Sequence, residues 1–133
     1  MIHLDTSFVV DLLREARKQP GLASQLLDSI RGEEVVVSVF VLCELYAGAE
    51  LARDPVQEKR AVEHLCGGLN VRIPDQKVAL VYGQLLATLQ KAGKSIATMD
   101  LLIAAAALLD HAPLVTRNLG HFNRVPGLAV RSY

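Results

Sequence analysis

Short runs of consecutive apolar residues recur along the chain, and longer segments with helical periodicity separate them. An apolar run of three to five residues bounded by turn-forming residues is typical of a strand buried on both faces. Five segments fit this description and are predicted to be strands: 2–4, 35–38, 69–73, 114–116 and 128–131.

The intervening segments predict helices whose ends are marked by glycine, proline and capping residues. The predicted helices span 6–17, 22–31, 39–51, 55–66, 75–92 and 99–110. Pro20 and Gly21 separate the first two helices, and Gly93 ends the fifth. Asp75 and Thr98 are predicted to cap the fifth and sixth helices.

Alternation of strands and helices predicts parallel strands joined by right-handed crossovers, and hence an α/β fold. We expect a three-layer α/β/α sandwich with a central parallel sheet, formed by one domain over residues 1–133. In such folds ligands bind at the carboxyl ends of the strands, where the strand order reverses. Asp5 directly follows the first predicted strand and is therefore expected at that edge.

The composition is rich in apolar residues, at 51% of the chain with a mean hydropathy of +0.29. No apolar run reaches the roughly 18 residues that a membrane span requires, so the surplus is expected to cover a subunit or partner interface. Met1 is followed at once by a predicted strand and not by the basic start and apolar core of a signal peptide. We therefore expect a cytoplasmic protein that does not bind membranes.

The formal net charge is zero, so the overall charge does not indicate nucleic-acid binding. Residues 111–133 nevertheless contain Arg117, Arg124 and Arg131 without any acidic residue, although each arginine could equally be a solvated surface residue. Cys43 and Cys66 lack the spacing of a zinc site or a disulfide framework and are predicted to be reduced, buried thiols.

Three carboxylates stand alone in long apolar or uncharged segments. Asp5 is the only carboxylate in residues 1–10, Glu44 is the only charge between Val35 and Ala49, and Asp100 is the only charge between Ser95 and Leu109. Burial of an unpaired carboxylate costs on the order of several kcal/mol. No residue of opposite charge lies beside any of the three in the sequence. A divalent cation with oxygen ligands, such as Mg²⁺, is the simplest partner.

Each carboxylate also has a purely structural interpretation. Asp5 could cap the first helix, and Glu44 could lie at a solvated helix margin. The negative charge of Asp100 could be stabilised by the positive end of its helix dipole. Asn118, which follows the predicted strand at 114–116, could be a turn residue or could orient a metal-bound water through its amide oxygen. The chain has no phosphate-binding loop, GxGxxG, GxSxG or HExxH motif.

Four segments together resemble the PIN-domain family, and within it the VapC-type toxins of toxin-antitoxin pairs. They are LDTSFVVDLL, VLCELYAGAE, GKSIATMDLLIAAAALL and LVTRNLGHFNRVPGL, and the resemblance covers the whole chain. It implies that Asp5, Glu44 and Asp100 are metal ligands and that Asn118 is a fourth site residue, with Thr6 and Thr116 in supporting positions. His121 departs from the family pattern, in which an acidic residue often precedes the phenylalanine, and leaves the binding of a second metal ion open.

The resemblance implies an Mg²⁺- or Mn²⁺-dependent endoribonuclease whose carboxylates activate water for in-line attack on an RNA phosphodiester. It also implies a VapB-type antitoxin partner and a homodimer. Arg117, Arg124 or the basic segment at Arg14, Arg17 and Lys18 could hold the RNA backbone, and His121 could contact phosphate. The alternatives are a nuclease of the same fold that acts in RNA maturation or on DNA, and a non-catalytic RNA-binding or scaffold protein.

Overall fold

The computed structural model describes residues 1–133 and contains a five-stranded parallel sheet with helices on both faces. The strands are β1 (Ile2–Leu4), β2 (Val35–Ser38), β3 (Asn70–Arg72), β4 (Leu114–Val115) and β5 (Val130–Arg131). The helices are α1 (Thr6–Arg17), α2 (Leu22–Ser29), α3 (Val39–Glu50), α4 (Pro55–Cys66), α5 (Lys77–Lys91), α6 (Thr98–Leu109) and α7 (Leu119–Phe122).

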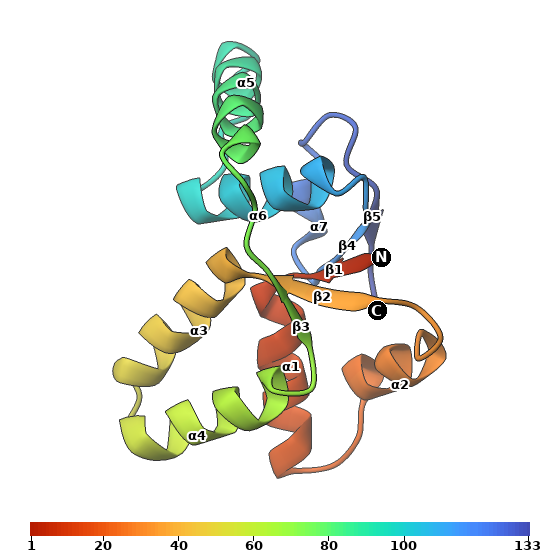
Figure 1. Ribbon diagram of the computed structural model, residues 1–133, viewed down its shortest axis with the longest axis vertical. Coiled ribbons are helices and arrows are strands. Elements are labelled where there is room, and N and C mark those ends of the chain that lie inside the picture. Colours follow the sequence, from red (N-terminus) through yellow and green to blue (C-terminus); the bar gives the residue numbers. More distant parts are fainter.

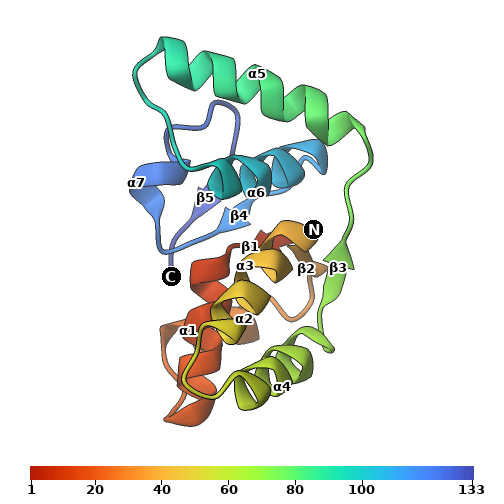
Figure 2. The same ribbon diagram turned by 90° about the vertical axis from the view of Figure 1, so that its left-hand side faces the viewer.

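Helices α1 to α4 lie on one side of the sheet, and α6 and α7 lie on the other, with α5 stacked outside α6 (Figure 1; Figure 2). The predicted three-layer α/β/α sandwich is therefore confirmed. None of the helices is both long enough and apolar enough to cross a lipid bilayer.

The strand order is β3-β2-β1-β4-β5, and every neighbouring pair is parallel. Strands β2 and β3 thus extend the sheet from β1 to one edge, and β4 and β5 extend it from β1 to the other edge. The order reverses between β1 and β4, where His3 pairs with Leu114 and Leu4 with Val115. The crevice beyond the carboxyl ends of these two strands is the expected ligand position in such a sheet.

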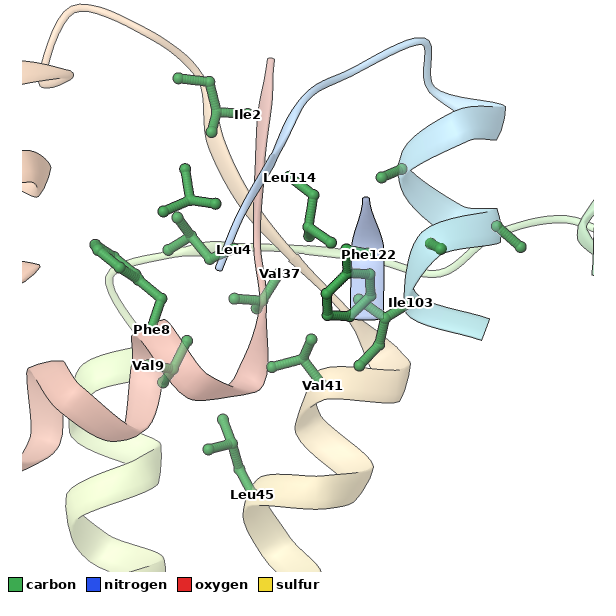
Figure 3. Close-up of a cluster of buried hydrophobic side chains, with 14 of the residues drawn as sticks. Ile2, Leu4, Phe8, Val9, Val37, Val41, Leu45, Ile103, Leu114 and Phe122 are labelled. Carbon is green, nitrogen blue, oxygen red and sulfur yellow. The ribbon is translucent and has the colours of Figure 1, made fainter. Parts of the chain in front are cut away.

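The core consists of apolar side chains from the sheet and from its two helical layers. Figure 3 shows Phe8 and Val9 of α1 on one side and Ile103 and Phe122 of α6 and α7 on the other. Helix α6 is buried on most of its circumference because four consecutive alanines, 104–107, allow close packing on both sides. This burial fixes the amino end of α6, whose first turn contains Asp100.

Most predicted boundaries agree with the structure, and the differences lie at the ends of elements. Strands β3, β4 and β5 are shorter than predicted by one or two residues, and α2 ends two residues early. Gly93 ends α5 with a left-handed backbone (φ 68°), as predicted, and Lys94 N bonds to Leu89 O in the arrangement typical of a glycine helix end.

Two local predictions were wrong. The N-cap of α6 is Ala97, and Thr98 is the first helical residue. Cys66 is buried as predicted but Cys43 is exposed, because it points away from the stripe of α3 that faces the core. Asp75 precedes the assigned N-cap of α5, Gln76, by one residue, but its Oδ1 accepts a hydrogen bond from Lys77 N and so bonds to the amino end of the helix as predicted.

Candidate active site

Asp5 lies at the carboxyl end of β1 with only 1% of its surface exposed. It is the N-cap residue of α1, but its side chain makes no capping bond to the helix. Its Oδ2 instead accepts hydrogen bonds from Ser7 Oγ (2.8 Å) and Thr116 Oγ1 (2.7 Å). The helix-capping role considered for the Asp5 side chain is therefore wrong.

The other oxygen of Asp5, Oδ1, accepts no hydrogen bond within the protein. Because no fully buried side-chain oxygen in the structure lacks a partner, Oδ1 must reach the surface of the sheet edge. Asp5 thus keeps one carboxylate oxygen free of protein hydrogen bonds at the carboxyl end of β1, while the rest of its side chain is enclosed.

The two hydroxyl groups that hold Asp5 also fix the loop after β4. Thr116 Oγ1 accepts a hydrogen bond from Asn118 N (2.9 Å), and Ser7 Oγ accepts one from Arg117 N (3.0 Å). The loop that carries residues 116–118 is therefore tied to the same carboxylate from the opposite strand.

Glu44 lies on α3, half-buried, and its Oε1 accepts a 2.6 Å hydrogen bond from Thr6 Oγ1. Since Thr6 directly follows Asp5, this bond holds Glu44 next to the carboxyl end of β1. Its Oε2 has no protein partner. Glu44 is thus anchored toward the sheet edge and is not a freely solvated residue at the helix margin.

Asp100 lies in the first turn of α6 with 17% of its side chain exposed, and its Oδ2 is 3.2 Å from His121 Nδ1. Burial and, to a smaller extent, the negative charge of Asp5 raise the pKa of Asp100, and the contact with His121 opposes them. The contribution of Asp5 indicates that the two carboxylates are near one another in the fold, although they are far apart in the sequence.

The structure therefore places Asp5 near both Asp100 and Glu44. The charge of Asp5 raises the pKa of Asp100, and Thr6, the residue after Asp5, donates a hydrogen bond to Glu44. As placed, no three His, Cys, Asp or Glu side chains lie close enough together to form a complete ligand group for an ion. Each carboxylate nevertheless keeps one oxygen without a protein hydrogen bond, namely Asp5 Oδ1, Glu44 Oε2 and Asp100 Oδ1. Three such oxygens at one sheet edge fit the preference of Mg²⁺ and Mn²⁺ for carboxylate ligands.

Asn118 is exposed and is the N-cap residue of α7, a four-residue helix that the sequence did not predict. Its side chain makes no capping bond and no other hydrogen bond, so it lies at the site without a fixed partner. The turn interpretation of TRNLG was therefore incomplete, because one turn of helix follows directly and carries His121 back toward Asp100.

Arginines surround the acidic crevice along α1. Asp11 Oδ1 lies 2.7 Å from Arg117 Nη1 and 3.6 Å from Arg14 Nη1, and its Oδ2 accepts a hydrogen bond from the Tyr133 hydroxyl. Burial and Asp11 together raise the pKa of Tyr133, so its hydroxyl stays a donor. Two guanidinium groups share a single carboxylate here, which leaves a net positive charge at the rim. Sequence reasoning proposed the arginines but missed Asp11 and Tyr133, because only the fold brings them together.

A groove of about 250 Å³ starts at Thr6 and Glu44 and runs between α1, α3 and α4. Five apolar residues line it: Val10, Leu13, Leu45, Ala49 and Val62. Arg14, Arg17 and Glu58 form its polar side, and Arg17 is paired with Glu58. The groove is thus continuous with the candidate site and mostly apolar along its length.

A family model described as the PIN domain matches residues 2–128. The chain belongs to the PIN-domain family. Ribonuclease VapC1 of Haemophilus influenzae strain R2866 is 33% identical to this PIN domain over 125 residues, which cover 94% of this chain and 92% of the relative. Ribonuclease VapC19 of Mycobacterium tuberculosis is 30% identical over 94% of both chains.

Solved structures agree with this assignment. A chain in the DNA-bound VapBC2 complex of Rickettsia felis superimposes with a TM-score of 0.92 at 27% identity, covering 100% of this PIN domain and 99% of that chain. A chain of FitAcB from Neisseria gonorrhoeae superimposes with a TM-score of 0.81 at 30% identity, covering 98% and 96%. The resemblance to VapC-type PIN domains read from the sequence is confirmed.

Proposed function

We propose that this PIN domain, spanning residues 1–133, is a VapC-type endoribonuclease, the toxin of a toxin-antitoxin pair. Asp5, Glu44 and Asp100 hold an Mg²⁺ or Mn²⁺ ion at the carboxyl edge of the sheet. The observation that carries the proposal is the enclosed Asp5, which keeps one carboxylate oxygen without a protein hydrogen bond and whose charge raises the pKa of Asp100. The VapC ribonucleases related to this chain support it, and divalent-metal dependence is a general property of such nucleases.

A bound divalent ion would supply a more acidic water and would neutralise charge on the phosphate in the transition state. The protein side chains hold the ligand carboxylates in position. Thr116 and Ser7 keep Asp5 Oδ1 directed toward the crevice, and Thr6 does the same for Glu44. The Asn118 side chain, free of internal hydrogen bonds, can orient the attacking water through its amide oxygen.

The RNA backbone would lie along the arginine rim beside α1. Arg117 and Arg14 are 52% and 66% exposed, and together they carry one positive charge more than Asp11 neutralises. Phosphate contacts of this kind position a nucleic acid without reading its sequence. A cytoplasmic location is part of this proposal, because cellular RNA is the intended substrate.

The apolar groove between α1, α3 and α4 is the proposed binding site of the antitoxin. Solved relatives include VapBC complexes, in which the VapC-type chain is bound to its antitoxin. An amphipathic segment in the groove would cover the half-buried Val10 and Leu13, and a basic side chain at its end would reach Glu44. The antitoxin would then block the acidic crevice directly.

A second apolar surface follows the chain from β3 into α5 and is the proposed homodimer contact. Val71, Ile73 and Leu80 are 40%, 79% and 68% exposed along this segment. We expect Leu80→Glu to shift a dimer toward monomer in analytical ultracentrifugation. Leu22→Glu, at a 63% exposed position on α2, is the matched control and should leave the sedimentation unchanged. A Leu80→Glu protein that sediments like the wild type would exclude this surface.

Incubation of the purified protein with structured RNA tests the activity. Cleavage should require Mg²⁺ or Mn²⁺, stop on addition of EDTA, and fall by about 100-fold or more in Asp5→Ala and Asp100→Asn. Asp28→Asn is the matched control, because Asp28 is an exposed aspartate on α2 that pairs only with Arg31. Full activity of Asp100→Asn would overturn the assigned chemistry.

Expression in cells separates the toxin from the alternatives. Growth arrest that Asp5→Ala relieves is expected for a toxin. Harmless expression of a protein that cleaves RNA or DNA in vitro would instead indicate a nuclease with a maturation role. Absence of cleavage with either ion, combined with RNA binding, would indicate a non-catalytic RNA-binding protein.

A further inference from the structure

Tyr133, which follows β5, contacts α1 through both its ring and its hydroxyl. The ring packs edge-on against Phe8, with the ring centroids 4.8 Å apart. The hydroxyl donates a hydrogen bond to Asp11 Oδ2 and lies 3.4 Å from the backbone oxygen of Ser7. Because Phe8 is fully buried, the aromatic contact fixes the ring of Tyr133, and its hydroxyl in turn holds the Asp11 carboxylate.

Asp11 carries this restraint to Arg117. Arg117 Nη1 lies 2.7 Å from Asp11 Oδ1 and 3.0 Å from Oδ2, so one nitrogen bonds to both oxygens. At its other end, the backbone N of Arg117 donates to Ser7 Oγ, and that hydroxyl donates to Asp5 Oδ2. Arg117 is thus held at its backbone and at its guanidinium group, with only Ser7 between it and Asp5.

The Arg117 guanidinium keeps one edge free. Only Nη1 takes part in the contact with Asp11, whereas Nε and Nη2 donate to no protein atom and the side chain is 52% exposed. Two neighbouring guanidinium nitrogens match two oxygens of a phosphate. A side chain that is already fixed loses less conformational entropy on binding than a mobile one, so this restraint favours binding of a phosphate at the free edge.

We propose that Tyr133 is a positioning residue for RNA, which acts through Asp11 to fix the Arg117 guanidinium so that its Nε and Nη2 bind a phosphate beside the scissile one. This inference rests on the proposed function, since the ligand is a phosphate of the RNA substrate. Arg14 is a weaker candidate for the same restraint, because it lies 3.6 Å from Asp11 and is 66% exposed.

The order of the Arg117 guanidinium tests the proposal without RNA. Tyr133→Phe keeps the ring against Phe8 and removes only the hydroxyl. By NMR relaxation, the ¹⁵Nε order parameter of Arg117 should be high in the wild type and should fall in Tyr133→Phe toward that of the exposed Arg53. Tyr82→Phe, on α5, is the matched control and should leave the Arg117 signal unchanged. An equally mobile Arg117 in the wild type and Tyr133→Phe would overturn the proposal.

Cleavage kinetics with structured RNA test the consequence for the substrate. In Tyr133→Phe the KM should rise by about 5-fold while kcat stays within about twofold, because a remote phosphate contact binds the ground state and the transition state alike. A purely structural role would lower the amount of active enzyme, and hence the apparent kcat, at unchanged KM. Tyr82→Phe should keep both constants.

A double-mutant cycle identifies the residue through which Tyr133 acts. In the Arg117→Ala background, Tyr133→Phe should raise KM no further, because the guanidinium that it positions is gone. An unchanged KM in Tyr133→Phe, or effects of the two substitutions that multiply, would overturn the inference and leave the proposed nuclease intact. Absence of RNA cleavage by the wild type with either ion would overturn the proposed function and this inference with it.

Discussion

Thr116 Oγ1 donates a 2.7 Å hydrogen bond to Asp5 Oδ2 and thereby links the carboxyl ends of β4 and β1 at the point where the strand order reverses. The two residues are 111 positions apart. The same hydroxyl accepts a hydrogen bond from Asn118 N. Thr116 therefore holds both the buried carboxylate and the loop that carries Asn118.

Replacement of Thr116 by valine should lower the stability of the metal-free protein. The change removes a donor from a buried carboxylate and the acceptor of Asn118 N, so we expect a loss of about 1.5–3 kcal/mol in the free energy of unfolding. Urea denaturation measures this loss. Thr116→Ser keeps the hydroxyl and is the control, and equal stability of Thr116→Val and wild type would contradict the role assigned to this bond.

Asp100→Asn should separate stability from activity. Burial and Asp5 raise the pKa of Asp100, so the folded state disfavours its ionised form and the carboxylate lowers stability at neutral pH. In EDTA at pH 7.5 the asparagine variant should be at least as stable as the wild type, although RNA cleavage is lost. The difference should shrink as the pH falls through the folded pKa of Asp100 and vanish only below the unfolded value of 3.8, where the carboxyl is neutral in both states. A less stable variant at pH 7.5 would contradict this account.

The pair of His3 and Asp110 should make the fold sensitive to acid. Burial lowers the pKa of His3 below 6.5 despite the 2.7 Å contact with Asp110, and Arg72 and His3 lower the pKa of Asp110 below 3.8. Both groups bind fewer protons when folded than when unfolded, so stability is full above pH 6.5 and falls as the pH decreases.

The contribution of His3 to the free energy of unfolding should begin to fall near pH 6.5. The fall should approach about 1.4 kcal/mol per pH unit down to the folded pKa of His3. His3→Gln, which cannot titrate, should flatten the dependence between pH 7 and 5. Chemical denaturation across this range measures the slope. Parallel curves for the variant and the wild type would show that His3 is not the responsible group.

Arg117→Ala should weaken RNA binding through the loss of one phosphate contact. Measured in the Asp100→Asn background to prevent cleavage, the slope of log K against log salt concentration should decrease in magnitude by roughly 0.7 for single-stranded RNA. Arg31→Ala removes an equally charged, 78% exposed residue next to α2 and should leave the slope unchanged. Equal slopes for both variants would exclude Arg117 from the RNA path.

Gly48→Trp should prevent antitoxin binding without unfolding the protein. Gly48 lines the groove between α1, α3 and α4, and an added Cβ there meets no atom within 4 Å. The indole would fill the space proposed for the antitoxin, so co-purification with the antitoxin should be lost. Gly32→Trp, also at an open position but outside the groove, is the control. Wild-type affinity of Gly48→Trp for the antitoxin would place its docking surface elsewhere.

Sequence patterns predicted the long elements because each signal is local. The apolar runs at β1 and β2 and the helical period of α1 and α2 are complete within a dozen residues. Helix α7 was missed because its four residues are too few to show a period. The exposure of Cys43 was missed because α3 is apolar on two sides, and only packing decides which side faces the core.

By itself, the sequence determined the fold class and singled out the three isolated carboxylates, since burial of an unpaired charge is unfavourable wherever the segment lies. It also determined the resemblance to PIN domains that the comparisons confirmed. Only the tertiary structure decided which groups hold Asp5, which arginines share Asp11, and that His121 contacts Asp100. The long-range contacts among these join residues 21 to 122 positions apart, and local periodicity contains no information about such pairs.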